Sequence, residues 1–191
     1  MKARHILLLL VCFQALFSQA QIRGETNPEE TIFYFIRHAE KDRSTPNDRN
    51  PGLTEKGRLR ALNWAYFFRE IPLKAIYSTN YIRTTSTAQP IAEEKSLPII
   101  IYNPSQLKIQ DFIRENKGKK VLVVGHSNTT PQLVNAIIGE KKFEQMHDED
   151  NSSLFILTES PPWVGEKFWK SIKKFMSKGN VFLRSETISL F

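Results

Sequence analysis

The feature that most constrains this chain is an apolar run that ends abruptly in charged and polar side chains. Residues 33–36 are apolar, and Arg37, His38, Ala39 and Glu40 follow directly. Alternate side chains of an extended chain point to opposite faces, so this run predicts a strand buried inside a mostly parallel sheet. The polar residues then lie at its carboxyl end, where open α/β sheets bind their ligands.

Two further apolar runs end in polar motifs of the same kind. Residues 120–124 lead into Gly125, His126 and Ser127, and residues 75–79 lead into a segment that holds Arg83 and ends in Thr87 and Ala88. Both runs predict buried strands. Three strand ends therefore carry residues suited to chemistry.

In this order the motifs resemble those of the histidine phosphatase superfamily, which has the phosphoglycerate-mutase-like fold. The pair Arg37-His38 resembles its opening motif, residues 125–127 its second histidine segment, and residues 78–88 the segment in which Ser, Arg and Thr-Ala follow one another. The resemblance covers residues 31–158 and is greatest to short members that include bacterial phosphohistidine phosphatases. It implies an enzyme that is transiently phosphorylated on His38.

Strand and helix signals alternate along residues 31–158. Further strands are predicted at 97–102 and 153–158, and helices at 54–69, 83–95, 106–116 and 129–138. This alternation predicts a three-layer α/β/α sandwich with a mostly parallel central sheet. In the helix that follows residue 54, Thr54 is the expected N-cap. One stripe at helical spacing is formed by Leu59, Leu62, Ala65, Tyr66 and Arg69.

The two ends of the chain predict segments outside this domain. A basic start, an apolar run over residues 6–17 and small residues up to Ala20 predict a signal peptide at 1–20, since the run is too short for a membrane span. Residues 21–30 are expected to form a flexible arm. We therefore expect a periplasmic or secreted protein, and cleavage removes the one cysteine, Cys12.

Residues 159–191 are predicted to form a basic amphipathic extension. Its helical face carries Phe168, Trp169, Ile172, Phe175 and Met176. Such a helix at 163–178 is typical of weak contact with a membrane surface, and packing on the domain is the alternative. Removal of Lys2 and Arg4 with the leader leaves 25 basic against 20 acidic side chains, so the charge gives no argument for nucleic-acid binding.

The resemblance assigns roles to residues at the three strand ends. Arg37 and Arg83 provide planar forks for phosphoryl oxygens, and His38 is the nucleophile, whose other ring nitrogen should donate to a carbonyl oxygen. His126 is expected to donate to the phosphoryl group, with Ser127 or Asn128 at the helix start as a further substrate-binding residue. No metal or cofactor is expected, because His5 and His147 form no ligand set with these residues.

One element of the resemblance is missing, namely a carboxylic acid that protonates the leaving group. The stretch 102–107 has no carboxylate, and Ser127 stands where other branches have an aspartate. The candidate proton donors are Glu40, Asp42 and the acidic run Asp148 to Asp150. The alternative for each of them is an ordinary charged residue on the surface. Without an acid, the enzyme should favour substrates whose leaving groups depart easily.

The sequence thus predicts an exported, metal-independent phosphatase that hydrolyses a phosphate monoester or a phosphoramidate through a phosphohistidine on His38. Its partner would be a phosphorylated small molecule or a phosphoprotein. Two alternatives stay open: phosphoglycerate-mutase-like phosphoryl transfer, and a protein that binds a phosphate ligand with little turnover.

Overall fold

The computed structural model describes residues 30–159 and 183–187. Its strands are β1 (Thr31–Arg37), β2 (Ala75–Ser78), β3 (Ile99–Ile101), β4 (Lys120–Gly125), β5 (Leu154–Glu159) and β6 (Leu183–Thr187). Its helices are α2 (Glu55–Phe68), α3 (Ile82–Lys95), α4 (Ile109–Glu115) and α5 (Thr129–Ile138). The predicted alternation of strand and helix is therefore confirmed for the described part of the chain.

The described strands form one sheet in the order β3-β2-β4-β1-β5-β6. Strands β1 to β4 run parallel, while β5 is antiparallel to β1 and β6 is parallel to β5. In the register of β1 and β4, Arg37 lies opposite Gly125. Both strands therefore end at the same level, which brings the histidine that follows each of them to the same edge of the sheet.

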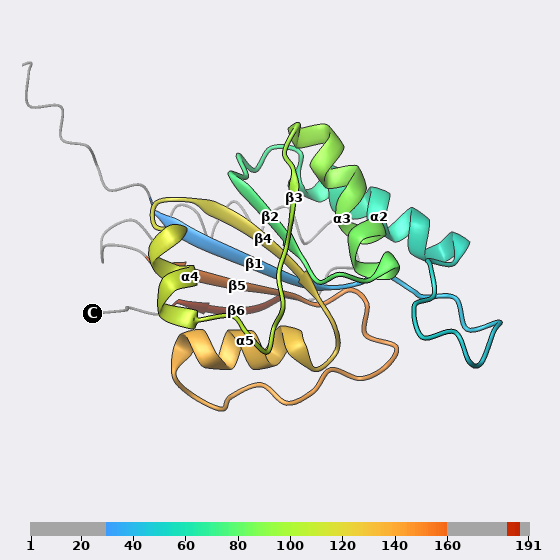
Figure 1. Cartoon of the computed structure of the whole chain (residues 1–191). Coiled ribbons are helices and arrows are strands. Elements are labelled where there is room, and N and C mark those ends of the chain that lie inside the picture. The colour runs from blue at the N-terminus through green and yellow to red at the C-terminus, as the bar shows by residue number, and fades with distance from the viewer. Residues whose placement is uncertain (1–29, 160–182, 188–191) are drawn as a thin grey trace, which may run out of the picture.

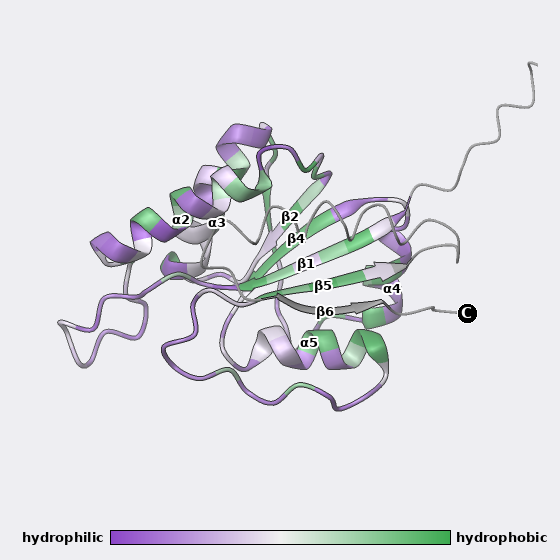
Figure 2. Cartoon of the chain, turned by 180° about the vertical axis from the view of Figure 1, so that it is seen from behind, coloured by the Kyte–Doolittle hydropathy of each residue, from purple (hydrophilic) through white to green (hydrophobic). Residues whose placement is uncertain are grey.

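Helices cover both faces of the sheet, with α2 and α3 on one side and α4 and α5 on the other (Figure 1). The alternation within β1 explains both cores: Tyr34 and Ile36 pack with α2 and α3, and Phe33 and Phe35 pack with α4 and α5. Figure 2 shows the resulting pattern, in which largely hydrophobic strands lie between helices that carry both hydrophobic and hydrophilic residues. The predicted three-layer sandwich with a mostly parallel sheet is confirmed.

Helix α2 begins as predicted but buries a different face. The Thr54 side chain accepts a hydrogen bond from the Gly57 amide at 3.0 Å, which confirms it as the N-cap. The predicted stripe is wrong, because Leu59, Leu62 and Tyr66 are 54–60% exposed. The buried face instead holds Gly57, Ala61, Trp64, Ala65, Phe67 and Phe68. Its three large rings remove more apolar surface from water than two leucines would.

The remaining boundaries differ from expectation by a few residues. Helix α3 continues through Pro90, and α4 is shorter than predicted. Helix α5 ends as predicted at Gly139, whose φ of 71° suits a residue without Cβ. The signal peptide and the amphipathic helix around 163–178 lie outside the described residues. Among the residues that the structure describes, no helix is long and apolar enough to cross a membrane.

Candidate active site

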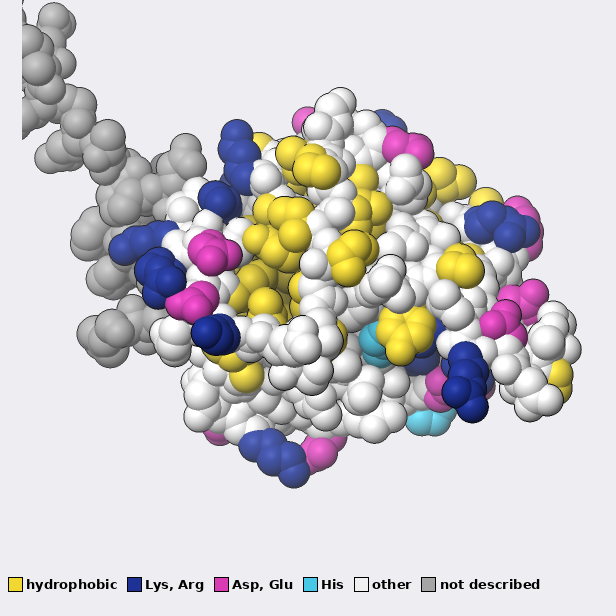
Figure 3. Space-filling model, viewed as in Figure 1, with side chains coloured by type: hydrophobic (Ala, Val, Ile, Leu, Met, Phe, Trp, Pro, Cys, Tyr) yellow, Lys and Arg dark blue, Asp and Glu magenta, His cyan; other side chains and the backbone are white. Residues whose placement is uncertain are grey.

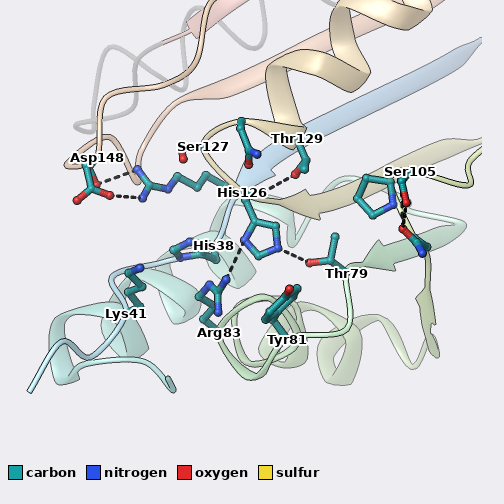
Figure 4. A pocket seen from close by; sticks show the side chains of 14 residues that line it. His38, Lys41, Thr79, Tyr81, Arg83, Ser105, His126, Ser127, Thr129 and Asp148 are labelled. Carbon is teal, nitrogen blue, oxygen red and sulfur yellow. Dashed lines mark hydrogen bonds and ion pairs between the residues drawn. The ribbon is translucent and has the colours of Figure 1, made fainter. Parts of the chain in front are cut away.

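The three motif-bearing strand ends meet at one pocket of about 480 Å³. Histidine atoms and Lys or Arg atoms appear side by side on the surface at this end of the molecule (Figure 3). The lining residues come from four strand ends and from the loop before β5 (Figure 4). They are Arg37, His38, Lys41, Thr79, Tyr81, Arg83, Asn103, Pro104, Ser105, His126, Ser127, Asn128, Thr129 and Asp148.

His38 is held in a fixed orientation by its own backbone. Its Nδ1 lies 2.7 Å from the carbonyl oxygen of Ala39, which can only accept, so Nδ1 carries the proton. The backbone is anchored on both sides: Nδ2 of the Asn151 side chain donates to the His38 carbonyl oxygen at 2.8 Å, and the backbone amide of Ala39 donates to Thr87 Oγ1 at 2.9 Å. Nε2 is left with a lone pair, which is the tautomer expected of a nucleophile.

The electrostatic surroundings keep His38 neutral. The residue is 3% exposed, and this burial is the largest cause that lowers its pKa to about 3. The nearby charges of Arg37, His126 and Arg83 lower the pKa further, against the opposing effect of the Ala39 hydrogen bond. At neutral pH the ring therefore keeps the lone pair that an attack on phosphorus requires.

His126 faces His38 across the pocket, with ring centroids 5.5 Å apart. Its Nε2 lies 2.9 Å from Thr79 Oγ1, and its Nδ1 lies 3.5 Å from Nη2 of Arg83, which can only donate. Burial, followed by the charges of Arg83, Arg37 and Lys41, lowers the pKa of His126 to about 4. A bound phosphoryl dianion would offset those positive charges and favour a protonated, donating His126.

The glycine before His126 allows a close approach of α5. A Cβ on Gly125 would lie 2.7 Å from Thr130 Oγ1, a distance that a side chain cannot adopt without movement of its surroundings. Thr130 in turn lies within α5, and the amide of His126 donates to Thr129 Oγ1 at 3.0 Å. The start of α5 is thus packed directly behind the second histidine.

Arg37 is held by the loop that precedes β5. Its Nη1 donates to the carbonyl oxygens of His147 and Asp148, both at 2.8 Å, and its Nη2 donates to Asp148 Oδ1 at 3.0 Å. These contacts occupy the end of the guanidinium. Nε is buried and has no hydrogen-bond partner in the described part of the chain. The edge formed by Nε and the second proton of Nη2 is therefore left for a phosphoryl oxygen.

Arg83 is positioned by an aromatic ring instead of a carboxylate. Its guanidinium carbon lies 4.3 Å from the centroid of the Tyr81 ring, a cation–π distance. The same ring meets His126 edge-on, at 4.9 Å between centroids. Nε and Nη1 of Arg83 are buried and have no partner among the described residues, so this arginine also has donors to spare.

The candidate proton donors differ in whether they line the pocket. Asp148 lines the pocket, but the hydrogen bond from Arg37, together with the charge of Arg43, keeps the pKa of its carboxyl below the usual range. It is therefore ionised at neutral pH, so it has no proton to donate.

Glu40 and Asp42 do not reach the pocket, and neither do Glu149 and Asp150. Glu40 turns toward α2, where Arg60 binds both of its oxygens at 2.7–3.0 Å. Asp42 is exposed and accepts from the Ser44 amide. These four candidates are corrected because none of them lines the pocket, and Glu40, Asp42 and Asp150 are each bound by a local partner.

The pocket also contains residues that the motifs did not indicate. Lys41, Thr79 and Tyr81 lie within three residues of a predicted motif or strand end, and Asn103, Pro104 and Ser105 begin two residues after the end of β3. Their position shortly after predicted strands is the sequence signal that could have identified them as pocket residues. Ser127 and Asn128 line the pocket as expected. Within the described ranges, no group of three or more His, Cys, Asp or Glu side chains is arranged to hold a metal ion.

The resemblance inferred from the motifs is confirmed by comparison with known families. Residues 33–103 match the family model of the histidine phosphatase superfamily (branch 1). This segment contains Arg37, His38 and Arg83 and ends before His126. The match supports phosphatase or phosphoryl-transfer chemistry at the site. A search of curated proteins found no match to this chain.

Similar solved structures include several phosphatases. YhfR of Bacillus stearothermophilus is 18% identical, with a TM-score of 0.48 over 57% of this chain and 80% of the other. The protein histidine phosphatase SixA in complex with tungstate is 16% identical, with a TM-score of 0.47 over 55% and 74%. A mycobacterial glucosyl-3-phosphoglycerate phosphatase is 14% identical, with a TM-score of 0.47 over 58% and 80%.

Proposed function

We propose that this protein is an exported phosphatase that acts through a phosphohistidine on His38. The observation that carries the proposal is the arrangement around His38. This histidine is neutral, and it shares one pocket with Arg37 and Arg83, which keep donors without a partner among the described residues. A phosphoryl group that enters this pocket would meet a nucleophile and cationic donors for its equatorial oxygens, the elements on which phosphoryl transfer depends.

The reaction would proceed in two steps. Nε2 of His38 attacks phosphorus as the bond to the leaving group breaks, which forms a phosphohistidine and releases the alcohol or amine. Water then attacks phosphorus, the phosphorus–nitrogen bond breaks, and inorganic phosphate leaves. Because Nδ1 keeps its proton in the hydrogen bond to Ala39, the ring can carry the positive charge that develops during attack.

Hydrolysis is favoured over the mutase alternative by the predicted export, since a mutase requires a sugar-acid bisphosphate environment typical of the cytosol. The leader supports a periplasmic or secreted location for the mature chain from Gln21. N-terminal sequencing of the natural product tests this, and an intact Met1 would contradict it. The substrate class is a phosphate monoester or a phosphoramidate on a small molecule or a protein.

Turnover of an aryl phosphate by the purified mature protein tests the activity. We expect phosphate release by the wild type and none above background for His38→Ala, with both proteins equally folded by circular dichroism. Binding of inorganic phosphate without turnover would instead favour a binding protein. Transfer between positions of phosphoglycerate without net release of phosphate would favour a mutase.

A further inference from the structure

The pocket contains one cation to which the proposed mechanism assigns no role. Lys41 lines the pocket and is half-buried, and its ammonium makes no hydrogen bond or ion pair with any residue that the structure describes. Figure 4 shows it at the end of the pocket where His38 and Asp148 lie. An ammonium that lines the pocket and makes no hydrogen bond or ion pair with a described residue is available to a bound substrate.

The backbone around Lys41 fixes its direction. The Thr54 amide donates to the Glu40 carbonyl oxygen at 2.9 Å, and the Asp42 amide donates to the Gly52 carbonyl oxygen at 2.8 Å. Lys41 itself pairs with Leu53 in an isolated bridge. Because neighbouring side chains of an extended segment point to opposite sides, Glu40 turns outward to Arg60 and Lys41 turns into the pocket.

Within residues 30–159 and 183–187, no carboxyl group that could donate a proton lines the pocket. Asp148 is ionised by its arginine partners, and Glu40 is bound by Arg60 outside the pocket. His126 is neutral in the free site, its Nε2–H is directed at Thr79, and once protonated by a bound phosphoryl group it donates to that group and not to the leaving oxygen. The lining side chains with a dissociable proton that remain are Lys41 and Tyr81.

Lys41 is better placed than Tyr81 for proton transfer. The Tyr81 ring supports Arg83 on its face and meets His126 with its edge. The charged groups that act on the Lys41 ammonium are Arg43, Arg83, Asp148 and Arg37. Burial first, and then the charges of Arg43, Arg83 and Arg37, lower the pKa of the Lys41 ammonium, against the opposing charge of Asp148. A lowered pKa makes an ammonium a better acid.

We propose that Lys41 is the proton donor for the leaving group, in place of a carboxylic acid; the role rests on the proposed phosphatase function. When Nε2 of His38 bonds to phosphorus, the electrons of the breaking phosphorus–oxygen bond move to the leaving oxygen, which takes a proton from Nζ of Lys41. The neutral amine then accepts a proton from the water that attacks the phosphohistidine. The second step restores the ammonium, and protons balance over the cycle.

The test compares a series of aryl and alkyl phosphates in the wild type and in Lys41→Arg, which keeps the charge but is a far weaker acid. Wild-type kcat/KM should depend only weakly on leaving-group pKa. In Lys41→Arg we expect a loss of about 10²–10⁴-fold for alkyl phosphates and less than about tenfold for 4-nitrophenyl phosphate. Lys41→Met should show the same steeper dependence of kcat/KM on leaving-group pKa. This variant replaces Lys41→Arg in the test if the arginine side chain does not fit the pocket.

The matched control is Lys56→Met, because Lys56 is an exposed lysine that contacts Glu40 at 3.6 Å outside the pocket. This variant should leave kcat/KM unchanged for every aryl and alkyl phosphate in the series. The assignment of Lys41 would be overturned if Lys41→Arg lowered kcat/KM equally for all substrates or did not lower it at all. It would also be overturned if kcat/KM of the wild type fell steeply with leaving-group pKa, or if Tyr81→Phe made this dependence steeper. These results leave the phosphatase function intact, whereas wild-type protein that hydrolyses no phosphate ester would contradict both.

Discussion

Arg37 donates two hydrogen bonds to Asp148, one to its carbonyl oxygen at 2.8 Å and one to its carboxylate at 3.0 Å. The second carboxylate oxygen binds Arg43 at 2.5 Å. Asp148 thus links the loop after β1 to the loop before β5 and orients the guanidinium beside the nucleophile. This geometry describes a positioning residue, and the lowered pKa of its carboxyl excludes a proton donor at neutral pH.

Asp148→Ala should therefore lower kcat/KM by about tenfold, since Arg37 loses one charged acceptor but keeps its backbone acceptors. Asp148→Asn retains an oxygen acceptor and should lose less. The loss should be the same for good and poor leaving groups. If Asp148→Ala instead makes the dependence on leaving-group pKa steep, Asp148 is an acid after all.

Arg83 and His126 are expected to stabilise the transition state more than the bound substrate. Alanine at either position should lower kcat/KM by on the order of 10²–10³, the scale for loss of one charge-stabilising donor. Arg83→Lys should recover little, because an ammonium has no planar fork. Arg69→Ala is the control, since this exposed arginine pairs with Glu94 away from the pocket. A silent change at Arg83 or His126 would remove that residue from the mechanism.

The buried histidines predict a loss of stability in acid. The pKa of His38 is lowered to about 3 and that of His126 to about 4, whereas an unfolded histidine titrates near 6.5. Below pH 6.5 the unfolded chain therefore binds more protons than the native state, and the free energy of unfolding falls as pH falls toward 4. Each histidine contributes a slope of about 1.4 kcal/mol per pH unit.

Urea unfolding between pH 7 and pH 4.5 measures this slope, and the His126→Gln variant should show a shallower one. NMR titration of the imidazole signals gives a direct comparison. A midpoint near 6.5 for either His38 or His126 would contradict the electrostatic description of the site.

Gly57 lets α2 approach the loop after β1. A Cβ there would lie 2.3 Å from the Glu40 carbonyl oxygen, a backbone atom that cannot move aside cheaply. Gly57→Ala should destabilise the protein by about 1–3 kcal/mol, as overpacking does. The matched control is Gly52→Ala, whose Cβ would meet Ile82 at an ordinary 3.7 Å. Equal unfolding midpoints in urea for the two variants would show that the contact is not tight.

Much of this fold and site follows from the sequence because the strongest signals were local. The apolar runs that become β1, β2 and β4 each end at a polar motif, and parallel strands bring such ends together. The fixed tautomer of His38 also followed from its chemical role, as did the capping of α2 by Thr54.

What the sequence did not predict depends on tertiary contacts. Which stripe of α2 is buried was decided by the aromatic rings that fit against β1, such as Phe68, which meets Tyr34 edge-on at 5.4 Å. The direction of Glu40 depends on Arg60, which lies twenty residues further along the chain. The inward direction of Lys41 depends in turn on the pairing of its segment with Leu53.

The central claim is that His38 carries the phosphoryl group, and trapping of the intermediate tests it most directly. The mature protein is mixed with an aryl phosphate, quenched in alkali because phosphohistidine is labile to acid, digested, and analysed by mass spectrometry. We predict one phosphorylated peptide, with the phosphoryl group on His38, which disappears in His38→Ala together with turnover. Full activity in His38→Ala, or a phosphoryl group located on another residue, would contradict the account.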